Sequence, residues 1–124
     1  MMTSIFFVAA GGAIGATARY LTGVAAVRIM GHGFPWGTMT VNIVGSFLMG
    51  VIVVVMAEKS GQKFSPFLVT GILGGFTTFS SFSLDAITIY ERGQVGLAAA
   101  YVSASVILSL AAIFAGLLIT RNVL

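Results

Sequence analysis

Apolar residues along this 124-residue chain fall into four long runs separated by short polar stretches. The runs cover about residues 5–27, 36–57, 64–90 and 95–120. Each is long enough for a helix to cross the hydrocarbon core of a bilayer, which takes roughly 20 residues. The pattern therefore predicts an all-α membrane protein, in which residues 1–124 form a single domain of four transmembrane helices.

The third run interrupts its own helical pattern. Its middle contains the string G-G-F-T-T-F-S-S-F-S, which begins at Gly74. Glycine pairs and hydroxyl residues weaken a helix, and hydroxyls can bond the backbone groups that are freed. We therefore expect a break over residues 74–79. Carbonyls freed in a broken membrane helix can bind a hard cation such as Na⁺, and a close-packed kink is the alternative interpretation.

The other three runs place small or polar residues on one helical face. Gly11 and Gly15 form a G-x-x-x-G pattern, which allows a second helix to approach closely. The second and fourth runs each carry a polar stripe at four-residue spacing, which keeps its members on one face. The stripes are Thr38, Asn42 and Ser46 in the second run, and Tyr101, Ser105 and Ser109 in the fourth.

Composition strengthens the membrane interpretation and excludes several functions. Charged residues make up 7% of the chain, against about 25% in an ordinary soluble domain. The six Lys and Arg residues form no cluster, so no nucleic-acid surface is expected. Cysteine is absent, and neither G-x-S-x-G nor H-E-x-x-H occurs, so no catalytic centre is expected. The first run lacks a preceding basic segment, which favours a span over a signal peptide.

The basic residues give almost no preferred orientation. Four spans place Lys59, Lys63 and Arg121 on one side of the membrane and Arg28 and Arg92 on the other, with Arg19 near the end of the first span. The positive-inside rule then hardly distinguishes the two directions. Insertion both ways and pairing as an antiparallel homodimer is one outcome, and a single topology set by one charge is the other.

Several residues within the spans are candidates for binding an anion. Phe79 and Phe82 lie among hydroxyl residues, and the positive edge of an aromatic ring attracts an anion, although packing is the simpler use of such a pair. Asn42 can donate its amide NH₂ to an anion or to a neighbouring helix. Arg19 and Asp85 are ionisable residues inside spans and are functional candidates for that reason, with snorkelling as the alternative for Arg19.

Three segments of the chain resemble the Fluc fluoride channels, also called CrcB proteins. They are G-G-A-I-G-A-T-A-R-Y (11–20), G-T-M-T-V-N-I-V-G-S-F (37–47) and G-I-L-G-G-F-T-T-F-S-S-F-S (71–83). The resemblance implies an antiparallel, dual-topology homodimer in the cytoplasmic (inner) membrane. It also implies two pores that export fluoride passively and one structural Na⁺ at the dimer centre.

The resemblance also implies a role for individual residues. The anion pore falls on Asn42, Phe79, Phe82, Tyr101, Ser105 and Ser109, with Thr38 and Ser81, and the vestibule falls on Arg19. The Na⁺ falls on the backbone carbonyls of Gly74 and Thr77, two from each subunit. One departure is Asp85, where the family usually has Glu; the charge is kept and the reach is shorter.

Two other functions fit the four-span layout. A small proton-coupled exporter resembling the small multidrug resistance proteins needs an acid in the first span, and this first span has none. A structural membrane subunit does not explain polar stripes on several helices. Ring edges and hydroxyls attract any small anion, so only the family resemblance selects fluoride over chloride.

Overall fold

The protein is helical apart from short connections, in a computed structural model that describes residues 1–124. Four helical stretches are long and apolar enough to cross a membrane. Three are single helices: α1 (Met2–Met30), α2 (Trp36–Glu58) and α5 (Val95–Val123). Helix α1 extends beyond the expected range 5–27 at both ends, and α5 extends beyond the expected range 95–120 at its C-terminal end. The chain is thus a multi-pass membrane protein.

The third membrane stretch consists of four shorter elements. A single 3₁₀ turn, η1 (Gln62–Phe64), leads into a π-helix, η2 (Pro66–Leu73), and then into the short α3 (Gly74–Phe76). Helix α4 (Phe79–Glu91) completes the stretch. π-Helical backbone is rare in proteins and occurs frequently near functional sites.

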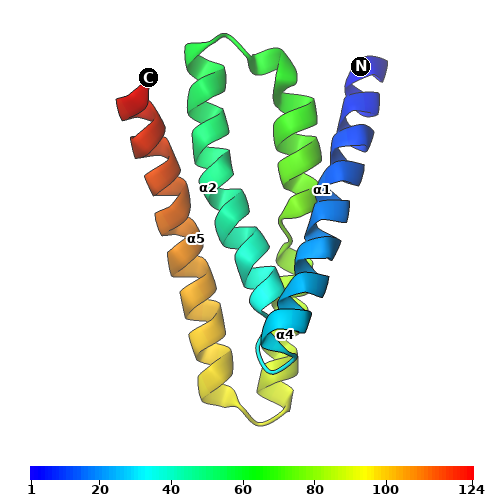
Figure 1. The fold of residues 1–124 in the computed structure, drawn as a ribbon, viewed down its shortest axis with the longest axis vertical. Coiled ribbons are helices and arrows are strands. Elements are labelled where there is room, and N and C mark those ends of the chain that lie inside the picture. The colour runs from blue at the N-terminus through cyan, green and yellow to red at the C-terminus, as the bar shows by residue number, and fades with distance from the viewer.

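The helices run up and down so that both termini lie at the same end of the molecule (Figure 1). The connection between α2 and η1 lies at that end too, whereas the α1–α2 and α4–α5 loops lie at the opposite end (Figure 1). Helix α2 packs chiefly against α5, and α1 packs chiefly against η2. The third stretch is therefore held between α1 and the α2–α5 pair.

Glycines bring α1 and the third stretch into backbone contact. A Cβ atom on Gly11 would lie 2.9 Å from the Cα of Gly71, and one on Gly15 would collide with the backbone of Ile72. A Cβ atom on Gly75 would lie 2.7 Å from the carbonyl oxygen of Gly12. The close approach predicted from the G-x-x-x-G pattern is confirmed, and Gly71 and Gly75 supply the opposite side of the contact.

Only Thr77 and Thr78 depart from helical backbone inside the third stretch. Thr77 has φ −87° and ψ 158°, and Thr78 has φ −152° and ψ 124°. The observed break is shorter than the expected one over residues 74–79, because Gly74 to Phe76 remain helical and α4 starts at Phe79. Helix α4 can start at once because Thr78 caps it: the Thr78 hydroxyl accepts from the backbone N–H of Ser81 at 3.1 Å.

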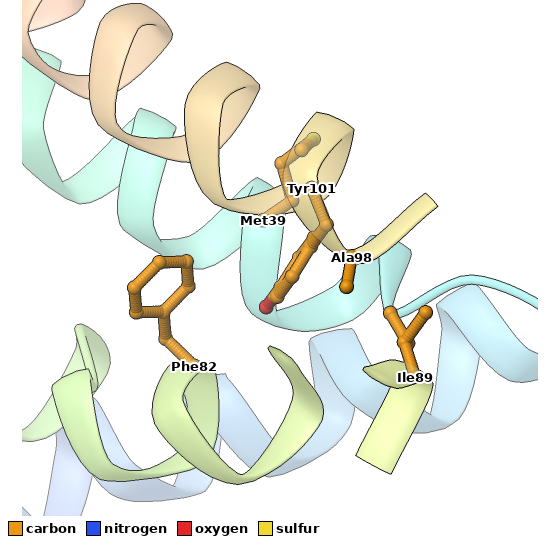
Figure 2. Packing of buried hydrophobic residues seen from close by; sticks show 5 residues of the cluster. All are labelled: Met39, Phe82, Ile89, Ala98 and Tyr101. Carbon is orange, nitrogen blue, oxygen red and sulfur yellow. The ribbon is translucent and has the colours of Figure 1, made fainter. Parts of the chain in front are cut away.

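A small core lies where α2, α4 and α5 meet. Figure 2 shows the Tyr101 ring between α5 and α4, with Phe82 on one side of it and Ile89 and Ala98 on the other. Only 18 of the 124 residues are buried in the single chain. Most of the apolar surface therefore faces lipid or another protein.

Candidate anion pathway and cation site

The extended pair Thr77–Thr78 is held by a side chain of another helix. Asn42 of α2 donates from Nδ2 to the carbonyl oxygen of Thr78 at 3.0 Å, and its Oδ1 accepts from the Thr78 N–H at 2.8 Å. The amide thus pairs with both backbone groups of one residue, as a neighbouring β-strand would. The interhelical bond considered for Asn42 is present, and one N–H of its amide remains for another acceptor.

This pairing changes which carbonyls near the break keep a hydrogen bond. In a continuous helix the N–H of Thr78 would donate to the carbonyl of Gly74, and the N–H of Ser81 to that of Thr77. Here the first N–H donates to Asn42 and the second to the Thr78 hydroxyl. No backbone N–H takes their place at Gly74 or Thr77. The two carbonyls that the family resemblance gives to Na⁺ are therefore available to a ligand.

Arg19 contacts the same segment from α1. Its Nε donates to the carbonyl oxygen of Gly75 at 3.0 Å, and the side chain is partly buried. Arg19 therefore does not simply extend towards the membrane surface. The positive charge of the Arg19 guanidinium also interacts favourably with the C-terminal end of the helical turns before Thr77, where the helix dipole is negative.

A groove of about 370 Å³ runs along the polar stripes of α2 and α5. We call it the serine groove; its polar and aromatic lining residues are Asn42, Ser46, Thr77, Thr78, Phe79, Phe82, Ser105 and Ser109. The hydroxyl oxygen of Ser105 is buried and has no hydrogen-bond partner in the chain. A buried hydroxyl without a partner is costly, so this atom is suited to bind a ligand or water.

Aromatic rings form a continuous series beside the serine groove. The ring centroids of Phe79 and Phe82 are 5.7 Å apart, and those of Phe82 and Tyr101 are 5.3 Å apart. Phe34, from the α1–α2 loop, contacts Tyr101 edge-on at 5.3 Å. Phe82 is 9% exposed and fixed by this packing, whereas Phe79 is 78% exposed in the single chain.

Tyr101 and Asp85 form a hydrogen-bonded pair at the loop end of this series. The Tyr101 hydroxyl donates to Oδ2 of Asp85 at 3.2 Å, and the tyrosine is fully buried. A phenol has one proton to donate, so the Tyr101 oxygen offers only lone pairs to any other partner. Ser105 and Ser109 line the serine groove, whereas the hydroxyl of Tyr101 is directed to the carboxylate.

Thr38 and Ser81 line a different cavity. It has a volume of about 510 Å³, and Arg19, Thr38, Thr78 and Ser81 are among its lining residues. We call it the arginine cavity. Thr78 also lines the serine groove, so the two spaces share one wall at the Asn42–Thr78 pair.

The sequence from residue 6 to residue 117 matches the family model described as CrcB-like protein, Camphor Resistance (CrcB). This match spans most of the chain. The chain belongs to the CrcB family. Curated relatives of this chain are named as ion channels.

Relatives of this CrcB chain are similar over nearly their full length. A protein of Cereibacter sphaeroides (strain ATCC 17029 / ATH 2.4.9), named fluoride-specific ion channel FluC, is 64% identical over 122 residues, which are 98% of each chain. A protein of the same name from Agrobacterium fabrum is 56% identical over 123 residues, again 98% of each chain. A third, from Ruegeria sp. (strain TM1040), is 53% identical and covers 100% of this chain and 99% of its own.

Two residues at the site are not indicated by the sequence pattern. Thr78 has its N–H and carbonyl bonded to Asn42 and its hydroxyl capping α4, and Phe34 packs against Tyr101. A threonine just before a helical segment is a weak N-cap signal that could have marked the first. Nothing in the sequence marks Phe34, because its partner lies in another helix.

Proposed function

We propose that this protein is a fluoride-selective channel that lets fluoride leave the cytoplasm passively across the cytoplasmic membrane and so lowers its concentration inside the cell. The carrying observation is the serine groove, with the unpartnered hydroxyl of Ser105 beside Phe82, in a chain 64% identical to a protein named fluoride-specific ion channel. Hydroxyls and ring edges replace the hydration shell of a small anion without a fixed positive charge.

The order of the lining residues supports a route for the ion. An anion entering the arginine cavity meets Arg19, Thr38 and Ser81. At the shared wall the remaining N–H of Asn42 is the next donor. Beyond it the anion passes the ring edges of Phe79 and Phe82 and then the hydroxyls of Ser105 and Ser109. Tyr101, bonded to Asp85, lies one turn before Ser105 on α5, at the loop end where the anion enters, and presents an acceptor to the water that leaves the ion.

The functional unit in this proposal is an antiparallel, dual-topology homodimer with two such routes. Phe79 is 78% exposed in the single chain, so a second copy is needed to enclose its ring. Arg19 bonds to Gly75 inside the molecule, so it is not counted on either side of the membrane. The basic residues on the two sides are then Lys59, Lys63 and Arg121 on one, and Arg28 and Arg92 on the other. So small a charge difference permits insertion in both directions.

A structural Na⁺ at the dimer centre belongs to the same proposal. The carbonyls of Gly74 and Thr77 have lost their helical donors, and Gly74 is exposed on the surface of the single chain. Two copies would supply four carbonyl oxygens, which are ligands that a hard cation prefers. The bound ion would fix the two copies relative to each other.

Fluoride efflux from liposomes tests the channel. Vesicles containing the purified protein are loaded with fluoride, and release is followed with a fluoride electrode at equal pH on both sides. We expect rapid release that Phe79→Ile or Phe82→Ile suppresses at least about tenfold, because a branched aliphatic side chain removes the ring edge. Release that requires a proton gradient would indicate an exporter instead, and vesicles that stay sealed would indicate a structural subunit.

A further inference from the structure

Asn42 and Arg19 both hold backbone groups of the break, although the family resemblance assigns both to the path of the anion. Asn42 reaches the segment from α2 and Arg19 reaches it from α1. Two side chains from different helices thus contact residues on either side of Thr77. Their contacts determine which backbone atoms are left for other ligands.

Along the break, each carbonyl that a side chain binds follows directly after one that has no backbone donor. Gly75 and Thr78 have carbonyl oxygens bonded to Arg19 and Asn42. Gly74 and Thr77, each one residue earlier, have no backbone donor. The availability of the Gly74 carbonyl depends on Asn42 directly, because Oδ1 of Asn42 takes the N–H that a helix would direct to Gly74.

Without the Asn42 amide, a continuous helix becomes the more stable backbone conformation of the third stretch. The N–H and the carbonyl of Thr78 would lose both partners inside the membrane, where an unbonded backbone group is costly. The N–H would regain a partner by bonding to Gly74, and the turn would close. The Gly74 carbonyl would then accept this N–H and be less available as a ligand.

We propose that Asn42 and Arg19 are positioning residues of the cation site: they hold the break open, keep the carbonyls of Gly74 and Thr77 free, and thereby set the affinity for Na⁺. This inference rests on the sodium site of the proposed function. Under this proposal Asn42 belongs to both ion sites. One N–H of its amide bonds to the Thr78 carbonyl and its Oδ1 accepts from the Thr78 N–H, so the second N–H stays available to the anion.

The affinity for Na⁺ can be measured without ion flux. A ligand that binds only the folded protein stabilises it by RT ln(1 + [L]/Kd), so the unfolding midpoint begins to rise once the ligand concentration exceeds Kd. Purified protein in detergent is titrated with NaCl against N-methyl-D-glucamine chloride at constant ionic strength, and the unfolding midpoint is recorded. We expect Asn42→Leu to raise the Na⁺ concentration at which the unfolding midpoint begins to rise by about tenfold or more, as loss of residues that orient metal ligands commonly does. Arg19→Leu should shift it in the same direction.

Two control variants match these changes. Ser46→Ala alters the same face of α2 one turn later, and Ser46 makes no hydrogen bond to the break. Arg28→Leu removes an exposed arginine from the end of the same helix as Arg19. Both controls should keep the Na⁺ response of the original protein within about twofold, since neither side chain makes a hydrogen bond to the break.

Each outcome decides between the two roles of Asn42. An unchanged Na⁺ response in Asn42→Leu and Arg19→Leu, with fluoride efflux lost, would overturn the inference and leave both residues as anion ligands only. Arg19→Leu carries the same prediction independently, so it decides the question if Asn42→Leu does not fold. An original protein without any Na⁺-dependent stabilisation overturns the sodium site and this inference together, while fluoride efflux still judges the channel separately.

Discussion

The two halves of the third membrane stretch contact the rest of the chain in opposite ways. Before Thr77, the stretch lies against α1 through glycines on both sides, so backbone touches backbone. After Thr78, α4 contacts α5 through large side chains, with Phe82 packed on Tyr101 and Asp85 bonded to it. The first half depends on the absence of side chains, and the second half depends on their chemistry.

The first half of the stretch therefore fixes the position of the backbone, and the second half supplies the side chains that meet the anion. Close glycine packing holds the first half at a set distance from α1, which places the carbonyls of Gly74 and Thr77. The second half can then present rings and hydroxyls to the serine groove. Substitutions in the first half should therefore change folding, and substitutions in the second half should change transport with smaller costs in stability.

The largest effect is expected at the glycine contact. A Cβ atom on Gly15 would lie 2.8 Å from the backbone nitrogen of Phe76, and backbone cannot rotate away as a side chain can. Gly15→Ala should lower the free energy of unfolding by about 1–3 kcal/mol or more, and Gly15→Leu should prevent folding. Denaturation in detergent measures the change.

Gly12→Ala is the matched control for that substitution. A Cβ atom on Gly12 would meet no heavy atom within 4 Å. Alanine is the better helix former by about 1 kcal/mol, so this variant should be as stable as the original or slightly more so. Equal losses at Gly12 and Gly15 would contradict the backbone contact.

An intermediate effect is expected at the pair between α4 and α5. Tyr101→Phe keeps the buried ring and removes the hydroxyl, which leaves the Asp85 carboxylate without this donor. We expect a loss of about 1 kcal/mol in the free energy of unfolding. Tyr20→Phe, at an exposed tyrosine, should cost nothing measurable. If the two variants unfold alike, the hydroxyl of Tyr101 is not bonded to Asp85.

The smallest effect on stability is expected at Ser105. Its hydroxyl is buried without a partner, so Ser105→Ala removes no hydrogen bond within the chain. Stability should change by less than about 0.5 kcal/mol while fluoride efflux falls, because the groove loses a donor. Thermal unfolding and liposome efflux on the same preparation measure the two. A clearly destabilised variant with normal efflux would assign Ser105 to packing instead.

Local sequence predicted much of the fold because its main features depend on neighbouring residues. Four apolar runs gave the spans, and the spacing of Gly11 and Gly15 gave the close helix contact that the structure confirms. The four-residue spacing of Ser105 and Ser109 placed both on one face, where they line one groove. These features follow from helix geometry alone.

The partners at the site could not be predicted, because they join distant parts of the chain. Asn42 and Thr78 are 36 residues apart, and Arg19 and Gly75 are 56 residues apart. The sequence showed that Asn42 lies on a polar face but left open whether its amide meets an anion or another helix. The structure adds the interhelical bond and leaves one donor free.

The sequence by itself determined that this chain crosses the membrane four times and that its third span is weak as a helix near Gly74. Hydrophobicity and helix propensity are properties of single residues and short windows, so they can be summed along the chain. Only the tertiary structure decided that the extended backbone is limited to Thr77 and Thr78, and which carbonyls remain free there. That outcome depends on competition for each N–H between the helix and side chains of α1 and α2, and the competition exists only once the helices have packed.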